Sequence, residues 1–381
     1  MSSKRVVFKK VSRDKSLTVY LPKRDFVDHC DYVDPVEGVV VIDPQQLKGK
    51  KVYVMLACTF RYGRQGEEVM GVAFRRDLLV VTRQVFPELQ DKSRLVHSRV
   101  QEKLVRKLGD YAFPFFFEFP DNLPCSVALQ PGPTDQGKKC AVEFEVKAFC
   151  ADQNDEKTDK QSSVRLMIRK VQFSPDSVGP APVAETTFEF LMSEKPLYVK
   201  LSLPKETFYH EEPVKVNVEI NNSSSRNIKD ISLSVEQVTN VVLYSNDKYV
   251  KSVAKEETTD TVPAGSSLKR EYCLFPSLAH NKERRGLALD GRLKHEDTNL
   301  ASSTIVKQEV LKDVQGMLVS YKVVLRMIAS GDVSLELPFR LMHPKPDAAK
   351  ESDPGDLVFE DFKRVYLKGV IGDDDDSATE A

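Results

Sequence analysis

Alternation of apolar and polar residues dominates the chain and is typical of half-buried β-strands. Between residues 142 and 148, apolar side chains alternate with glutamate and lysine. The same period of two recurs at 214–220, 319–327 and 333–341. Proline, glycine and Asn-Ser breakers separate these segments, as in β-sandwiches. We therefore predict an all-β chain built from antiparallel sheets.

One segment has a different period. From Val96 to Leu108, apolar residues recur every four positions between basic residues, and Gly109 follows as a helix stop. This pattern predicts a single short amphipathic helix over 95–108. Its apolar stripe fits ordinary packing against a sandwich edge, and its basic face fits a membrane or phosphate groups.

Breaks in the pattern divide the chain into domains. Residues 174–182 contain three prolines and a glycine, which predicts an extended hinge. The hinge separates a sandwich domain at 1–173 from a second at 183–346, each long enough for its own core. From 347 to 381 the sequence is polar and acidic, which predicts a flexible tail with one apolar island at 357–359.

Composition and charge exclude several classes of function. The 56 basic and 57 acidic residues give a net charge of −1, which argues against nucleic-acid binding. No apolar run approaches the ~20 residues of a membrane span, and the start lacks a signal peptide's apolar core. Six widely spread cysteines without a CxxC pair suit a reducing cytoplasm. Phosphate-binding glycine loops, nucleophile elbows and zinc-protease motifs are missing, and the six histidines are distant in sequence. We therefore expect a binding protein with no enzymatic activity, cofactor or metal.

The balanced total hides opposite charges at the two ends. Residues 1–24 carry eight basic residues and one acidic residue, a net of +7. Residues 347–381 carry eleven acidic and four basic residues, a net of −7. The ends are either two solvated segments, or the tail folds onto the basic end, or the basic end receives an acidic partner.

Longer stretches of sequence carry more specific information. They are KRDFVDH (23–29), GVVVIDP (38–44), FRYGRQGEEVMG (60–71), NLPCSVALQPGP (122–133), VEFEVKAF (142–149), VRLMIRKVQF (164–173), EQVTNVVLYS (236–245), the loop at 284–304, and FRLMHPKP (339–346). In this order they resemble the arrestin family over nearly the whole chain. The resemblance implies two seven-stranded antiparallel β-sandwich domains. It also implies a cytoplasmic protein that binds activated, phosphorylated G-protein-coupled receptors and blocks further coupling.

Some stretches narrow the resemblance. FLMSEKP (190–196), EQVTNVVLYS and FRLMHPKP look most like the visual subgroup, rod or cone. The implied partner is then light-activated, phosphorylated opsin in a photoreceptor cell, with the protein moving to receptor-bearing membranes and touching their surface peripherally. The alternative is a general β-arrestin-like adaptor for desensitisation and endocytosis. The tail lacks a clathrin box, and Tyr366 replaces the arginine of the adaptor pattern, so we expect clathrin and adaptor binding to be weak or absent. Self-association stays open.

The resemblance also implies sets of functional residues. A buried charge cluster, the polar core, falls on Asp25, Arg169, Asp290, Asp297 and Arg364. Phosphate sensing falls on Lys9, Lys10, Arg24, Lys107, Arg165 and Lys294. A three-element apolar clasp falls on Val6, Val7, Phe8, Val100, Leu104, Leu108, Leu357, Val358 and Phe359. The residues themselves leave a plainer alternative open, because an arginine on a strand is normally solvated; if Arg169 is buried, it needs carboxylate partners.

Two loops complete the expected contacts. A glycine-rich finger loop, expected to enter the cytoplasmic cavity of the receptor, falls on Tyr62, Gly63, Arg64, Gln65, Gly66, Glu67, Glu68, Val69, Met70, Gly71 and Val72. Candidates for membrane contact at the edge of the second domain are Phe190, Leu191 and Met192. The neighbouring edge loop is cut to 328–332, which weakens the case for its insertion in lipid.

Overall fold

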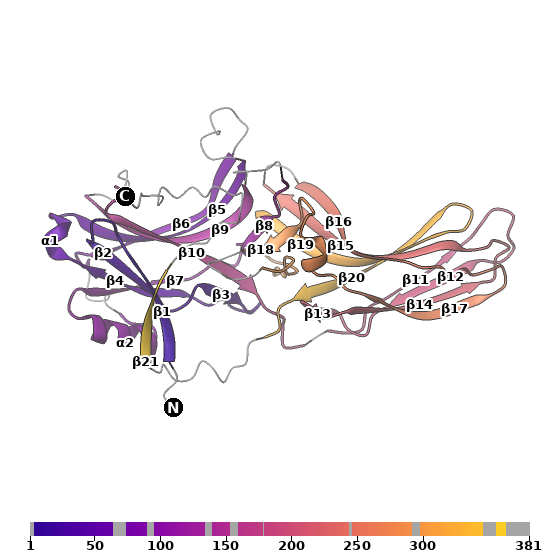
Figure 1. The fold of residues 1–381 in the computed structure, drawn as a ribbon, viewed down its shortest axis with the longest axis horizontal. Coiled ribbons are helices and arrows are strands. Elements are labelled where there is room, and N and C mark those ends of the chain that lie inside the picture. Colours follow the sequence, from indigo (N-terminus) through magenta and orange to yellow (C-terminus); the bar gives the residue numbers. More distant parts are fainter. Residues whose placement is uncertain are drawn as a thin grey trace.

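Two β-sandwiches lie end to end along the long axis of the molecule (Figure 1). The structure is a computed structural model that describes a defined part of the chain. The described residues are 4–63, 74–89, 95–133, 139–152, 159–177, 179–243, 246–291, 298–345 and 356–362. The all-β prediction with two sandwiches is confirmed. Within the described residues, no helix is long and apolar enough to span a membrane.

The first sandwich packs a five-stranded sheet against a seven-stranded one. The smaller sheet has the order β21 (Asp356–Asp361), β1 (Lys4–Val11), β2 (Leu17–Leu21), β4 (Val36–Ile42) and β7 (Ala112–Phe117). The larger sheet runs β18 (Ala288–Asp290), β8 (Val127–Leu129), β9 (Lys139–Ala151), β10 (Ser163–Gln172) and β3 (Asp25–Asp28), with β5 (Lys51–Gly63) pairing β9 and β6 (Phe74–Phe86) pairing β5. Two of these strands, β18 and β21, come from the C-terminal half of the chain.

The second sandwich has sheets of four and five strands. The four-stranded sheet runs β11 (Val183–Phe188), β12 (Leu197–Ser202), β14 (Val214–Asn222) and β17 (Ser267–Leu274). The five-stranded sheet runs β13 (Thr207–Tyr209), β20 (Asp332–Met342), β19 (Gly316–Ile328), β15 (Lys229–Val242) and β16 (Asn246–Glu257). A short 3-10 turn, η3 (Ala279–Asn281), follows β17.

The predicted alternation explains the cores. On β14, Val214, Val216, Val218 and Ile220 are all at most 1% exposed, while the residues between them face outward. Most strand pairs are antiparallel, as predicted. Three are parallel: β21 with β1, β3 with β10, and β13 with β20. These three pairings join segments distant in sequence, and they position every cluster described below.

Two α-helices are present in the described residues, the short α1 (Pro44–Leu47) and α2 (Arg99–Leu108). The helix predicted over 95–108 thus begins at Arg99, because the Ser98 side chain caps it by accepting from the Gln101 amide. It ends at Gly109, whose φ of 90° suits a glycine. The buried Gln101 side chain donates to the backbone carbonyls of Gly38 and Phe115, which fixes α2 to the smaller sheet.

Candidate functional site

Arg169 and Asp25 form an ion pair where β10 runs beside β3. The two strands are parallel with Arg169 opposite Asp25, so both side chains leave the sheet on the same face. Arg169 donates from Nε and Nη2 to the two carboxylate oxygens of Asp25, at 2.6 and 2.7 Å. The Arg169 side chain is only 12% exposed. A guanidinium this deeply placed depends on its partners for charge compensation.

A third hydrogen bond from Arg169 reaches the segment that follows β18. Its Nη1 donates to the backbone carbonyl of Gly291 at 2.8 Å. A Cβ atom on Gly291 would lie 2.9 Å from the Cβ of Ser126, so this close backbone approach requires glycine. Gly291 was not among the residues predicted from the sequence, although it directly follows Asp290 in a charged loop.

Asp290, a predicted member of the polar core, hydrogen-bonds to Ser302 and His343. One of its carboxylate oxygens accepts from the Ser302 amide at 3.0 Å, which turns the other toward His343 Nε2 at 2.7 Å. Burial alone would raise the pKa of Asp290, but the His343 hydrogen bond and nearby His210 lower it below its ordinary value. Burial lowers the pKa of His210 to about 4. The remaining predicted members of the polar core, Asp297 and Arg364, lie outside the described residues.

A second, more buried charge pair lies beside the first and was not predicted from the sequence. Lys170 is 3% exposed and contacts Asp28 through a 2.7 Å ion pair; its ammonium also donates to the Leu123 carbonyl. Burial by itself would lower the pKa of Lys170, but Cys125 and Asp28 raise it above the ordinary value. Adjacent residues on a strand face opposite sides of the sheet, so the Arg169–Lys170 dipeptide indicated one cation on each face of β10.

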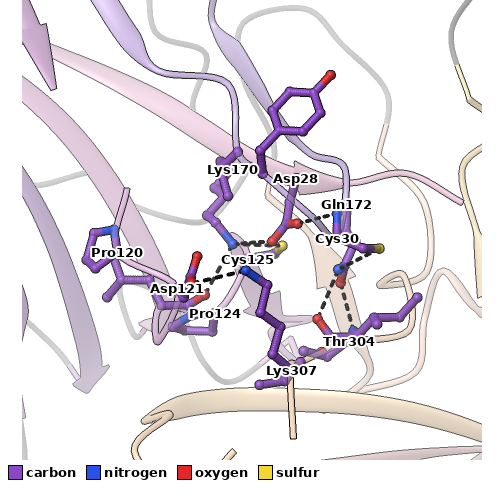
Figure 2. A pocket seen from close by; sticks show the side chains of 15 residues that line it. Asp28, Cys30, Pro120, Asp121, Pro124, Cys125, Lys170, Gln172, Thr304 and Lys307 are labelled. Atoms are coloured by element: carbon purple, nitrogen blue, oxygen red, sulfur yellow. Dashed lines mark hydrogen bonds and ion pairs between the residues drawn. The ribbon is translucent and has the colours of Figure 1, made fainter. Parts of the chain in front are cut away.

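Lys170 points into a small pocket between the two sandwiches (Figure 2). The cavity has a volume of about 20 Å³, enough for a water molecule. Across it, the Gln172 amide group exchanges two hydrogen bonds with the backbone of Ile305, at 2.8 and 3.0 Å. Lys307 pairs with Asp121 at 3.1 Å at the pocket's edge. Charged and amide contacts therefore join the two sandwiches close to Arg169.

An apolar cluster joins β1, α2 and β21, the tail strand. Its buried members are Val7, Val39, Val100, Leu104 and Ala112. Leu357 and Phe359 of the tail strand pack against them, together with Leu108. The Phe359 ring makes an edge contact with Tyr20 at 5.1 Å between centroids. The tail strand pairs in parallel with β1 from Lys4↔Asp356 to Lys9↔Asp361, so the acidic tail lies along the basic N-terminal strand.

Three predicted clasp residues lie outside this cluster. Val6 and Val358 are 39% and 40% exposed, because side chains on paired strands alternate and only every second one faces α2. Phe8 also faces away from the helix and makes an edge contact with Phe362, at 6.1 Å between centroids. Phe362 is 7% exposed and belongs to the main core. The clasp therefore has two apolar faces, one on each side of the β1–β21 ladder.

Predicted phosphate-sensing residues already contact the tail strand. Lys107 donates to the Leu357 carbonyl at 3.3 Å and lies 5.0 Å above the Phe359 ring. Lys9 lies 4.0 Å from the Asp361 carboxylate. The Arg24 guanidinium stacks over the Phe8 and Phe362 rings, at 4.6 and 5.9 Å. Three of the six predicted cations therefore hold the tail in this structure.

Of the other predicted phosphate-sensing residues, Lys10 lies on β1 and Arg165 on β10. Lys10 donates to the Arg165 carbonyl at 3.1 Å. The Arg165 guanidinium, 40% exposed, pairs with Glu145 at 2.6 Å. The structure thus places Lys10 and Arg165 side by side, while Lys294 lies outside the described residues.

The two predicted contact loops lie at separate places in the molecule. Tyr62 and Gly63 end β5, and Tyr62 is 56% exposed; the other finger-loop residues, 64–72, lie outside the described residues. The loop between β11 and β12 carries Leu191 and Met192, which are 89% and 95% exposed, while Phe190 packs partly on the core. Arg226 fixes this loop by donating to the Leu191 carbonyl.

Two protein-family models match the sequence. One is described as the N-terminal domain of arrestin (or S-antigen) and matches residues 17–174. The other is described as the C-terminal domain of arrestin (or S-antigen) and matches residues 193–346. Together they cover most of the chain and correspond to the two sandwiches.

Named relatives extend the match to nearly the full length. S-arrestin of Xenopus laevis is 53% identical over an alignment 379 residues long, which covers 97% of this chain and 95% of the relative. S-arrestin of Mus musculus is 54% identical over 376 residues, with 95% and 93% coverage. Beta-arrestin-2 of Homo sapiens is 52% identical over 398 residues, with 97% coverage of both chains. The chain therefore belongs to the arrestin family, whose members are receptor-binding adaptors and not enzymes.

Proposed function

We propose that this protein binds light-activated, phosphorylated opsin and blocks its further coupling to the G protein. The main support is that Lys107, Lys9 and Arg24 hold the acidic tail strand in the position that receptor phosphates are expected to take. A receptor phosphate carries about −1.5 to −2 charge and three acceptor oxygens. Several phosphates therefore outcompete single carboxylates for the same cations.

Release of the tail is the first step of the proposed mechanism. The tail strand contacts the first sandwich through the backbone ladder with β1 and through Leu357, Phe359 and Phe362. A multiply phosphorylated receptor segment takes over the basic surface of β1 and displaces this strand. Because both ligands need the same lysines, bound phosphate and bound tail exclude each other, which is a two-state switch.

Loosening of the contact between the sandwiches is the second step. The Arg169 guanidinium links Asp25 to the segment after β18 through Gly291. That segment continues into the loop that contains Lys294, a predicted phosphate ligand. Capture of this loop by phosphate pulls Gly291 away from Arg169. The finger loop then enters the receptor, and exposed Leu191 and Met192 touch the membrane surface.

The proposed location follows from the proposed partner: the cytoplasm of photoreceptor cells, with movement to opsin-bearing membranes on illumination. The S-arrestin relatives at 53% and 54% identity support the visual assignment. The domains proposed for these roles are 1–173 for phosphate sensing and 183–346 for the second sandwich, joined by 174–182 and regulated by the tail at 347–381.

A general receptor adaptor is the second candidate, because human Beta-arrestin-2 is 52% identical to this chain. Sedimentation with membranes separates the two candidates. We expect binding to lit, phosphorylated opsin membranes, and little binding to dark or unphosphorylated ones. Equal binding to an unrelated phosphorylated receptor, together with capture of clathrin or its adaptor, would favour the second candidate.

A further inference from the structure

Two histidines from distant parts of the chain meet at the junction of the sandwiches. Strand β13 pairs in parallel with β20, with Tyr209 opposite Met342. The next residue on each strand is a histidine, and the rings of His210 and His343 lie 4.5 Å apart. The His210 amide donates to the Met342 carbonyl at 3.1 Å, so the backbone fixes this juxtaposition.

Asp290 faces the histidines from β18, a strand of the first sandwich. The Ser302 amide holds one oxygen of its carboxylate, and the other oxygen, Oδ2, points at both imidazoles. Oδ2 lies 2.7 Å from His343 Nε2 and 3.9 Å from His210 Nε2. The Ser302 hydroxyl is 3.2 Å from Oδ2 and 2.9 Å from His210 Nε2.

Two imidazole nitrogens and one carboxylate oxygen are the donor set of divalent metals such as zinc and cobalt. The candidate ligand atoms all lie within 4.8 Å of one another. Metal–ligand bonds of about 2.0–2.2 Å place ligand atoms roughly 3–3.6 Å apart, so shifts of less than about 1 Å complete the geometry. One carboxylate is too few for calcium, which takes six to eight oxygen ligands.

We propose that His210, Asp290 and His343 form a binding site for a divalent transition metal, with the Ser302 hydroxyl or a water as fourth ligand. The three side chains are 7%, 13% and 24% exposed, so the cluster opens to solvent at His343. A bound ion links β18 of the first sandwich to β13 and β20 of the second. It therefore stabilises the arrangement in which Gly291, next to Asp290, accepts from Arg169.

Cobalt is a suitable probe, because Co²⁺ takes the place of Zn²⁺ and absorbs visible light when it has four ligands. We expect the full-length chain to bind one Co²⁺ with visible absorption that added Zn²⁺ removes, and Zn²⁺ to raise the melting temperature. His343→Gln, which keeps a hydrogen-bond donor for Asp290, should weaken binding about tenfold or more, as should Asp290→Asn. His280→Gln is the matched control, since the His280 ring bonds to Ser277, away from the cluster.

Each outcome decides the proposal. The proposal is supported if the wild-type chain and the His280→Gln control show the cobalt absorption and the zinc-dependent rise in melting temperature, and both site variants lose them. A folded wild-type chain without the cobalt absorption overturns it and leaves a purely hydrogen-bonded cluster. Absorption that persists in His343→Gln and Asp290→Asn also overturns it, because the ion then binds elsewhere. Circular dichroism checks that each variant is folded. If one variant is not folded, the wild-type absorption and the other variant decide the proposal.

Discussion

Replacing Phe359 by alanine should release the tail strand, and Val358→Ala on the same strand is the matched control. Phe359 is partly buried against the α2 cluster, contacts Tyr20, and lies beneath the Lys107 ammonium. Val358 pairs with Val6 in the same β1–β21 ladder, but its side chain faces outward and is 40% exposed. The two variants therefore differ in the face they truncate and share the backbone hydrogen bonds.

The free-energy cost of Phe359→Ala follows from how deeply the Phe359 ring is buried. Truncating a fully buried phenylalanine to alanine costs about 3–5 kcal/mol. Because Phe359 is only partly buried, about 2 kcal/mol is expected, which includes about 0.5–1 kcal/mol from the cation–π contact. At 1.4 kcal/mol per factor of ten, the open population rises about 30-fold. Val358→Ala, an exposed change, should cost under about 0.5 kcal/mol.

Hydrogen exchange of the backbone amides in β1 and β21 measures this opening directly, because local opening governs their exchange. Phe359→Ala should speed exchange in these strands about 30-fold, and exchange in β14 of the second sandwich should not change. Binding to lit, unphosphorylated opsin should rise in parallel. Equal exchange in the two variants would refute the reasoning, since the tail would then be held by its backbone or charges alone.

Three further predictions concern the charged contacts. Arg169→Glu should raise binding to lit, unphosphorylated receptor about tenfold, a modest value because Asp25 is 39% exposed. Adding Asp25→Arg should restore phosphate dependence, and absence of this rescue would contradict the pair's role. Lys9→Ala with Lys10→Ala should weaken binding to phosphorylated receptor selectively, with the loss shrinking at high salt; equal loss for both receptor forms would point to misfolding or membrane contact. Lys170→Ala should lower the free energy of unfolding by about 3–5 kcal/mol, because it leaves the Asp28 carboxylate without its buried cation. Lys215→Ala, on the exposed face of β14, should change it little in the same denaturation assay.

Local pattern predicted the strands well because burial on one face imposes a period of two, as at Val214 to Ile220. It misplaced the start of α2, because a capping hydroxyl on Ser98 outweighs the apolar Val96. The pairing of Arg169 with Asp25 came from the family resemblance, and its geometry depends on the parallel β3–β10 ladder.

The positions of Asp290 and the two histidines could not be predicted from the sequence. The Ser302 amide sets the direction of the Asp290 carboxylate. The histidines meet only through the β13–β20 pairing, which no local period encodes. Similarly, Val6 and Val358 fit the apolar pattern of the clasp but face solvent, because the pairing of β1 with β21 decides which side chains reach α2.

In the proposed mechanism, the tail strand and receptor phosphates compete for β1. A spin-label pair tests it most directly, with labels at Val358→Cys on the tail and Val11→Cys on β1, both exposed, in a background with the exposed Cys273 replaced. We expect one short distance in the free protein and with lit, unphosphorylated opsin, and its loss with lit, phosphorylated opsin. Persistence of the short distance while the phosphorylated receptor is bound would contradict the account.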